Sequence, residues 1–278
     1  MDTKQLAVTA TQARLLALQC VYEAASGHPG GSLSAMDLLT TLYFDELRVD
    51  PQNPRDPDRD RFVLSKGHCT PALYSILALR GFFPTEELHK FRQIEDHYSG
   101  HPDMVHVKGV DMSTGSLGQG ISAAVGMALA GKLDGKRYRV YAILGDGEIQ
   151  EGQTWEAAMA AAKYGLSNLC AMVDVNGLQI DGRTADVMPT EPLDQKYAAF
   201  GWNVISIDGH DYDAIKGALA RAKTVTDKPT MILAKTVKGK GVSFMENNAG
   251  WHGKAPSDEQ YAQGRQELEA LLRRLEAE

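Results

Sequence analysis

Five short apolar runs, each predicting a buried strand, are spread along the chain between longer amphipathic segments. The runs are residues 61–64, 138–144, 169–173, 202–207 and 230–234. Because strands and helices alternate, the sequence predicts a doubly wound α/β fold, a parallel sheet with helices on both faces. We expect residues 1–278 to form one such domain, since a chain of this length can bury about 75% of its unfolded surface and no low-complexity linker interrupts it.

Apolar residues at helical spacing predict the helices between these strands. The helices are residues 3–25, 34–47, 71–80, 85–93, one ending near 132, 154–164, 212–223 and one near the C-terminus. Two of them begin with capping-box patterns, Ser34 with Asp37 and Ser257 with Gln260. Such patterns predict where a helix starts.

Two of the predicted strands and the helix between them form a βαβ unit in the middle of the chain. Strand 138–144 leads through a polar turn into helix 154–164, and Gly165 stops the helix before strand 169–173. The two strands are therefore expected to be parallel neighbours with a right-handed crossover.

Asp146 and Asn176 follow the carboxyl ends of these two strands, where open α/β sheets bind ligands. A carboxylate and an amide oxygen are hard ligands that suit Mg²⁺ or Ca²⁺, particularly a Mg²⁺ that also binds phosphate oxygens. The backbone N–H groups of Gly145 and Gly147 could receive diphosphate oxygens at the start of a helix. Asp-Gly alone is equally a turn signal, but Asn176 after the next strand favours a ligand site.

Three glutamates lie in or just after the same turn. We expect Glu148 to be solvated. Glu151 and Glu156 lie at the start of the following helix, where carboxylates complement the positive end of the helix dipole. A structural role for these two is therefore as well supported by the sequence as a role at the site.

Four of the eight histidines sit beside a glycine in a loop. They are His28, His68, His101 and His252, in the sequences S-G-H-P, K-G-H, S-G-H-P and W-H-G. An isolated loop histidine is commonly only solvated, but this shared setting favours function, because imidazole can donate to phosphate and sugar oxygens and move protons. Two of the four lie in the segments 26–32 and 95–117, which are predicted to be irregular. His210 lies in a different setting, an Asp-Gly-His-Asp turn.

Charge and cysteine content exclude several classes of protein. The net charge of −7 disfavours nucleic-acid binding, since phosphate contacts need clustered Lys and Arg. The cysteines Cys20, Cys69 and Cys170 are far apart and lack C-x-x-C spacing, which argues against a zinc site and favours a reducing cytoplasm. No run approaches the ~18 apolar residues of a membrane span, so no membrane segment is expected.

The sequence G-D-G, followed by E-G and then by D-x-N-x-x-x-I-D-G, resembles the signature of thiamine-diphosphate enzymes, and in detail it resembles transketolases. The resemblance runs from Ser26 to Gly253, with the motifs in family order. One departure is Cys69, where a small residue is usual. Another is the loop N-N-A-G-W-H-G, which is abbreviated and puts the substrate contacts of His252 in question.

The resemblance implies a role for each candidate residue. Contact with the sugar substrate is implied for His28, His101 and His252. Binding or flanking of thiamine diphosphate is implied for His68, Gly115, Leu117, Gly145, Asp146, Gly147, Glu151, Glu156, Asn176 and His252. The implied ligands of Mg²⁺, or Ca²⁺, are Asp146, Asn176 and the backbone carbonyl of Leu178. By the residues alone, T-G-S-L-G-Q-G around Gly115 is equally a flexible turn before a helix.

Transketolases move a two-carbon ketol unit from a ketose phosphate to an aldose, and the resemblance implies this reaction here. Nothing in the sequence matches the pyrimidine-binding and C-terminal domains of full-length transketolases, the first of which supplies a glutamate that activates the cofactor. We therefore expect an N-terminal subunit of a split transketolase, inactive until a second chain completes it, by analogy as a heterotetramer. That second chain is expected to carry most of the residues that select the sugars.

Three alternatives stay open. The first is the same cofactor with another reaction, as in deoxyxylulose-phosphate synthases or 2-oxo acid decarboxylating components. The second is a non-catalytic module that binds nucleotide diphosphates or regulates a partner. The third, a Rossmann-type dehydrogenase, is the weakest because no G-x-G-x-x-G opens a helix after the first strand, and residues 115–120 have the spacing G-x-x-G-x-G.

Overall fold

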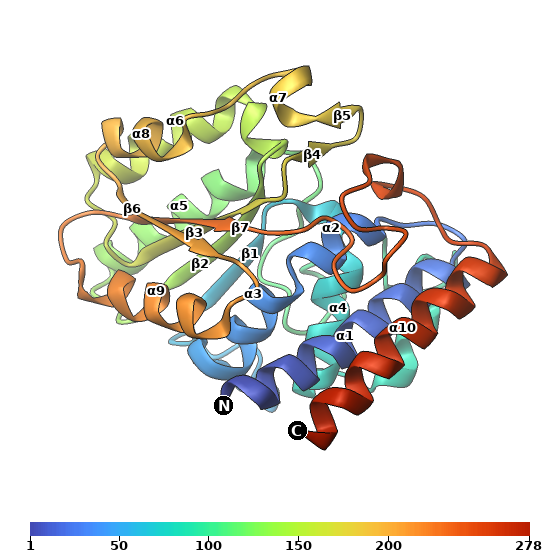
Figure 1. Ribbon diagram of the computed structural model, residues 1–278. Coiled ribbons are helices and arrows are strands. Elements are labelled where there is room, and N and C mark those ends of the chain that lie inside the picture. Colours follow the sequence, from blue (N-terminus) through green and yellow to red (C-terminus); the bar gives the residue numbers. More distant parts are fainter.

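Five parallel strands form the central sheet of the computed structural model, which describes all 278 residues. Their order across the sheet is β1-β2-β3-β7-β6 (Figure 1). The strands are β1 (Arg61–Leu64), β2 (Val140–Gly145), β3 (Leu169–Val175), β6 (Asn203–Asp208) and β7 (Thr230–Lys235). These are the five predicted strands, all paired in parallel. The predicted fold class is therefore confirmed.

Helices cover both faces of this sheet (Figure 1). The α-helices of more than five residues are α1 (Thr3–Glu23), α2 (Pro29–Ser34), α3 (Met36–Thr41), α4 (Thr70–Arg80), α5 (Gln119–Leu133), α6 (Gly152–Lys163), α8 (Leu193–Ala199), α9 (Tyr212–Thr224) and α10 (Asp258–Ala277). Shorter elements are the hairpin of β4 (Leu178–Gln179) and β5 (Gly182–Arg183), the turn α7 (Thr184–Val187), and the 3₁₀ segments Gly67–Cys69, Glu148–Gln150 and Ala249–Trp251.

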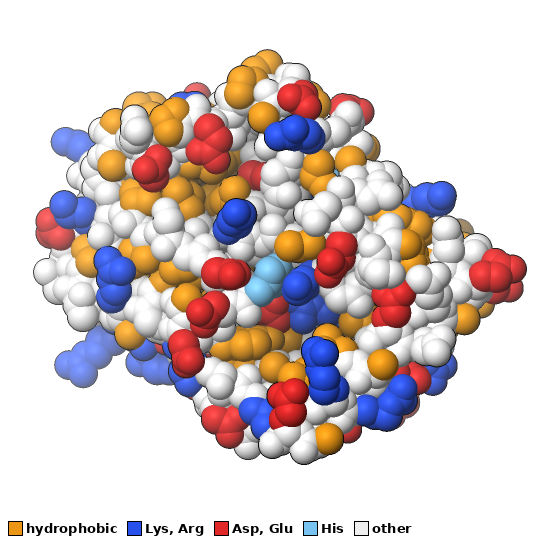
Figure 2. Space-filling view, in the orientation of Figure 1, with side chains coloured by type: hydrophobic (Ala, Val, Ile, Leu, Met, Phe, Trp, Pro, Cys, Tyr) orange, Lys and Arg blue, Asp and Glu red, His pale blue; other side chains and the backbone are white.

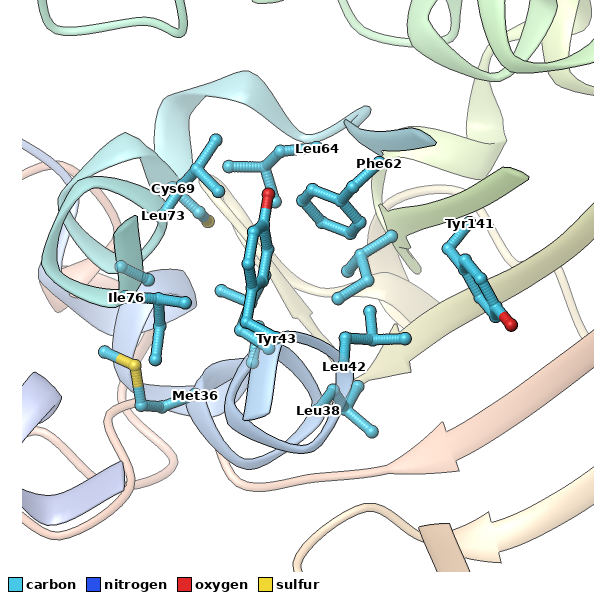
Figure 3. Close-up of a cluster of buried hydrophobic side chains, with 14 of the residues drawn as sticks. Met36, Leu38, Leu42, Tyr43, Phe62, Leu64, Cys69, Leu73, Ile76 and Tyr141 are labelled. Atoms are coloured by element: carbon cyan, nitrogen blue, oxygen red, sulfur yellow. The ribbon is translucent and has the colours of Figure 1, made fainter. Parts of the chain in front are cut away.

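Each face of the sheet has its own hydrophobic core, because successive side chains of a strand point to opposite faces. In β2, Tyr141 and Ile143 pack among α1, α3, α4 and α9. Their neighbours Ala142 and Leu144 pack among α5, α6 and α8. Figure 3 shows the first core, with Leu73 and Ile76 of α4 on the left, Tyr141 of β2 on the right and Leu38 of α3 between them. Burial on both faces explains why the central strands β2, β3 and β7 are largely apolar, whereas the edge strand β6 is partly exposed and carries Ser206 and Asp208.

Three details of the predicted helices are wrong. The predicted helix 34–47 is divided into α3 and a π-helical turn, Leu42–Glu46. Helix α2 begins within segment 26–32, which was predicted to be irregular, and has Pro29 in its first turn. Ser34 makes no cap, because it ends α2 and its hydroxyl donates to the Asp174 carboxylate at 2.6 Å. The predicted helix 85–93 is a 3₁₀ segment, Thr85–Lys90.

The C-terminal helix α10 lies along α1 on one side of the molecule (Figure 1). Its capping box, Ser257 with Gln260, is present as predicted. Leu268 of α10 is buried with Leu18 of α1 and Trp251, so the helix covers the segment that leads to His252. None of the helices has the length and apolar character needed to cross a membrane.

Candidate active site

A cleft opens at the carboxyl ends of β2 and β3, the edge of the sheet where the βαβ unit predicts a ligand site. Nine of the candidate residues line it: His68, Leu117, Gly145, Asp146, Gly147, Glu151, Asn176, Leu178 and His252. Lys66 and Lys238, which were not predicted from the sequence, line it too. Segments far apart in the sequence therefore meet at one edge of the sheet.

The proposed metal ligands lie on two adjoining turns. Gly145 and Asp174 are paired across β2 and β3, which brings the turn of Asp146 beside that of Asn176. Asp146 is 3% exposed; one carboxylate oxygen accepts from Gly147 N at 3.0 Å and the other from Gly177 N at 2.6 Å. Burial, and then the charge of Asp174, raise the pKa of Asp146 to about 7. A nearby cation would stabilise this carboxylate.

Asn176 is oriented by a buried aspartate. Its Nδ2 donates to Asp174 Oδ2 at 3.1 Å, which assigns the other atom as the amide oxygen. That oxygen accepts from Leu178 N at 3.1 Å. No group of three or more His, Cys, Asp and Glu side chains could hold a metal. The donor set is instead one carboxylate, one amide oxygen and one carbonyl, which fits a hard cation that takes its other ligands from water and phosphate.

Asp174 itself is fully buried and forms an ion pair with Lys66. It also accepts from the hydroxyls of Ser34 and Thr236, and Lys66 Nζ donates to Gly31 O at 2.9 Å. Burial alone would raise the pKa of Asp174, but Lys66 holds it below its ordinary value. A charged aspartate is therefore fixed beneath the cleft, and it positions Asn176.

Lys238 places a second ammonium group in the cleft. Its Nζ donates to Leu178 O at 3.3 Å and lies 3.1 Å from His252 Nδ1. The residue is 2% exposed, and burial lowers the pKa of its ammonium group. Because an N–H of Lys238 faces His252 Nδ1, that ring nitrogen is the acceptor and Nε2 carries the hydrogen when the ring is neutral.

The four glycine-flanked histidines come from four loops and gather at one place. Ring centroids are 5.1 Å apart for His28 and His68, 5.0 Å for His68 and His252, 5.5 Å for His28 and His252, and 6.4 Å for His28 and His101. None of the other four histidines belongs to this group. The shared sequence setting thus identified a cluster that the chain folds together.

These histidines are neutral near pH 7. Burial, followed by neighbouring positive charges, lowers the pKa of His28 to about 4 and that of His252 to about 3. The pKa values of His68 and His101 are lowered as well, mainly by burial. His28 Nδ1 is buried without a hydrogen-bond partner, which is costly unless a ligand supplies one. A neutral imidazole can both accept and donate a hydrogen bond.

The segment around Gly115 lies against His101. Gly115 has φ +148°, and a Cβ there would lie 2.8 Å from the His101 ring, so glycine is required for this close approach. Thr114 ties the segment to β1, since its hydroxyl donates to Leu64 O at 2.6 Å. His28, His101 and Gly115 thus lie next to the cleft residues rather than among those that line it.

The prediction that Glu148 is solvated is wrong. It is 2% exposed, and its carboxylate accepts from Ser65 Oγ at 2.5 Å, Gly118 N at 3.0 Å and Gly145 N at 3.1 Å. The turn folds beneath the loop that leads into α5, so this glutamate joins three segments of the cleft. Glu151 and Glu156 are both exposed in this chain. Glu151 lines the cleft, and Glu156 lies on α6 outside it.

Comparison with known proteins identifies the family. Residues 4–270 match the family model described as "Transketolase, thiamine diphosphate binding domain". The chain belongs to the transketolase family. A 6-deoxy-6-sulfo-D-fructose transketolase subunit from Clostridium sp. is 49% identical over 256 residues, covering 92% of this chain and 93% of that protein. An apulose-4-phosphate transketolase subunit from Phocaeicola vulgatus is 41% identical over 278 residues, 100% of this chain and 99% of its own length.

The solved structure of a transketolase from Campylobacter jejuni has the same fold, with a TM-score of 0.91 and 34% identity. The match covers 99% of this chain but only 46% of that one. This transketolase-family chain therefore spans about half the length of a single-chain relative, yet almost the full length of the relatives named as subunits. The resemblance to the N-terminal subunit of split transketolases is confirmed, and a dehydrogenase is excluded.

Proposed function

We propose that this chain is the half of a two-chain transketolase that holds thiamine diphosphate and a divalent metal ion, and that residues 1–278 form one domain. The observation that carries the proposal is the gathering of four neutral, glycine-flanked histidines beside a cleft built from Asp146, Asn176 and the carbonyl of Leu178. The family supports the cofactor, and the donor set supports Mg²⁺.

Each group would take a defined part in binding. Asp146, Asn176 and Leu178 O would hold the metal. The N–H groups of Gly145 and Gly147 are already bonded to the carboxylates of Glu148 and Asp146, which leaves Lys238 to receive diphosphate oxygens. Gly147 lets its turn pack closely against β4, because a Cβ there would lie 2.8 Å from the side chain of Gln179. When bound, thiamine diphosphate supplies the electron sink for cleavage of a carbon–carbon bond.

The histidines would act on the sugar. His28, His101 and His252 would donate to or accept from hydroxyl and carbonyl oxygens of the substrate, and His28 Nδ1 has its hydrogen-bonding capacity free for this. Because the pKa values of His28 and His252 lie well below 7, these two rings would accept a proton only transiently and return it readily. His68, which is stacked with His252, would face the diphosphate side.

A partner chain would supply the rest of the site. Relatives of matching length are named as subunits, which supports a second chain, and a heterotetramer is proposed by analogy with symmetric two-site enzymes. Three buried cysteines, all free, fit a reducing cytoplasm. The names of the relatives include a sulfo sugar and a sugar phosphate, which supports a ketose with an anionic tail as the donor.

The test is reconstitution. The chain is mixed with a partner carrying the pyrimidine domain, thiamine diphosphate, Mg²⁺, a ketose phosphate or 6-deoxy-6-sulfo-D-fructose, and an aldose acceptor. We expect transfer of a two-carbon unit only with both chains present, and its loss in a His28→Ala variant. Turnover by this chain alone would contradict the two-chain proposal. Consumption of pyruvate instead of a ketose would assign the chain to one of the other thiamine-diphosphate reactions.

A further inference from the structure

His210 lies outside the histidine cluster, in the turn between β6 and α9, yet it is held on both sides. Its Nδ1 is 2.7 Å from Asp37 Oδ2, and its Nε2 accepts from Val237 N at 2.9 Å. A backbone N–H can only donate, so Nε2 is the unprotonated nitrogen and Nδ1 donates to the carboxylate. The hydrogen bonds therefore specify one neutral tautomer. Figure 2 shows that histidine, acidic and basic side chains meet near the middle of one face of the molecule.

Asp37 is a rigid anchor for this ring. Arg14 binds it through two nitrogens, at 2.9 and 2.7 Å, and Tyr212 OH donates to it at 2.6 Å. Asp37 is 3% exposed. Burial alone would raise its pKa, but Arg14 and His210 hold the pKa of Asp37 below its ordinary value. The carboxylate stays charged, and helices α1, α3 and α9 fix its position.

Residues 236–239, which we call the cleft strap, connect this anchor to the cleft. Thr236 donates to Asp174, and Gly239 N donates to Gly30 O at 2.9 Å. Between them, Val237 N–H is held by His210, and Lys238 reaches Leu178 O and His252. The hydrogen bond to His210 is thus one peptide unit away from the ammonium group in the cleft.

We infer that His210 is a positioning residue, which acts by fixing the cleft strap so that the ammonium group of Lys238 lies between Leu178 O and His252. The relevance to cofactor binding rests on the function proposed above. Removing the acceptor leaves the Val237 N–H without its partner. Lys238 is bonded to Val237, so a shift of the strap moves its Nζ out of hydrogen-bonding distance.

Two substitutions separate the two bonds of His210. A glutamine carbonyl can take the place of Nε2 and accept from Val237 N–H, whereas an asparagine is only long enough to replace Nδ1 and donate to Asp37. His210→Gln therefore keeps the bond to the strap, and His210→Asn keeps the bond to the anchor. His106→Asn is a matched control, because His106 also contacts an aspartate, at 2.7 Å, but is exposed.

The experiment measures the strap and the cofactor separately. Amide hydrogen exchange at Val237 is followed in this chain, and binding of thiamine diphosphate with Mg²⁺ is measured by calorimetry in the complex with the partner. For His210→Asn we expect about tenfold faster exchange at Val237 and roughly 10–100-fold weaker cofactor binding. His210→Gln and His106→Asn should stay near wild type in both.

Unchanged exchange and affinity in His210→Asn would overturn the inference, as would equal losses of affinity in the Asn and Gln variants. A melting temperature lowered equally in both variants, with wild-type affinity, would assign His210 a purely structural role and likewise overturn it. If the wild-type complex binds no thiamine diphosphate, the proposed function fails, while exchange at Val237 still decides whether His210 holds the strap.

Discussion

The most direct test of how the cleft is built is the substitution Glu148→Gln. It changes one oxygen of a buried side chain into an NH₂ group and leaves its size almost unchanged. In the wild-type chain, Oε1 accepts from Ser65 and Gly118, and Oε2 accepts from Gly145. A glutamine that keeps its oxygen at the first position therefore directs a donor at the N–H of Gly145. The flipped amide leaves the N–H of Gly118 without an acceptor.

In either orientation at least one buried backbone donor loses its partner, which costs about 1–3 kcal/mol. The remaining bonds also become weaker, since hydrogen bonds to a charged group are roughly twice as strong as neutral ones. One opposing effect is that burial raises the pKa of Glu148, so removing the charge recovers part of the desolvation cost. We expect a net loss of about 2–3 kcal/mol, a drop of roughly 4–12 °C in melting temperature for a chain of this size.

Calorimetric melting at pH 7 measures this loss, with Glu276→Gln as the control, because Glu276 is exposed on the last turn of α10. The same samples are titrated with thiamine diphosphate and Mg²⁺ in the complex with the partner, where Glu148→Gln should bind more weakly because the turn carrying Gly145 is displaced. A melting temperature within about 1 °C of wild type would refute the reasoning that Glu148 joins these segments.

Three further outcomes are expected. Gly115→Ala should lower the free energy of unfolding by about 1–2 kcal/mol and weaken cofactor binding, because Gly115 has φ +148°. Gly126→Ala is the control and should not destabilise the chain, because the space around its Cβ is open. Urea denaturation measures both variants. The ring signals of His28 in NMR should titrate near pH 4, and a midpoint near 6.5 would contradict this. Since an unfolded histidine takes up its proton near pH ~6.5, the stability that neutral His28 contributes above that pH is lost as the pH falls towards 4. Asp146→Ala should abolish Mg²⁺-dependent binding of thiamine diphosphate in calorimetry, whereas an exposed neighbour, Asp181→Ala, should leave it unchanged.

The sequence predicts the sheet well because its central strands, β2, β3 and β7, are buried on both faces. An apolar run such as 169–173 needs no knowledge of its neighbours to be identified as a strand, and β3 differs only in extending to Val175. Asp146 and Asn176 could be predicted as a pair for the same reason. The βαβ rule makes their strands neighbours, and the carboxyl ends of parallel neighbours meet at one edge.

Residues whose role depends on contacts between distant segments could not be predicted. Glu148 has the local sequence of a solvated turn residue, and its burial follows from Ser65, 83 positions away, and Gly118, 30 positions away. Lys66 and Asp174 are likewise paired over 108 positions. The failed capping box has this cause too, since Asp37 is taken by Arg14 rather than by the start of a helix.

The charges of the cleft support binding of the metal ion and the diphosphate as a pair. Lys66 and Asp174 neutralise each other in their buried ion pair. Besides the neutral histidines, the other ionisable groups that line the cleft are the carboxyl groups of Asp146, Glu148 and Glu151 and the ammonium group of Lys238. A diphosphate alone would meet the carboxylate of Asp146, and a divalent cation alone would meet the ammonium group of Lys238. Bound together, the cation screens Asp146 from the diphosphate and the diphosphate screens Lys238 from the cation. By linkage, each should then raise the affinity of this half-site for the other by the same factor.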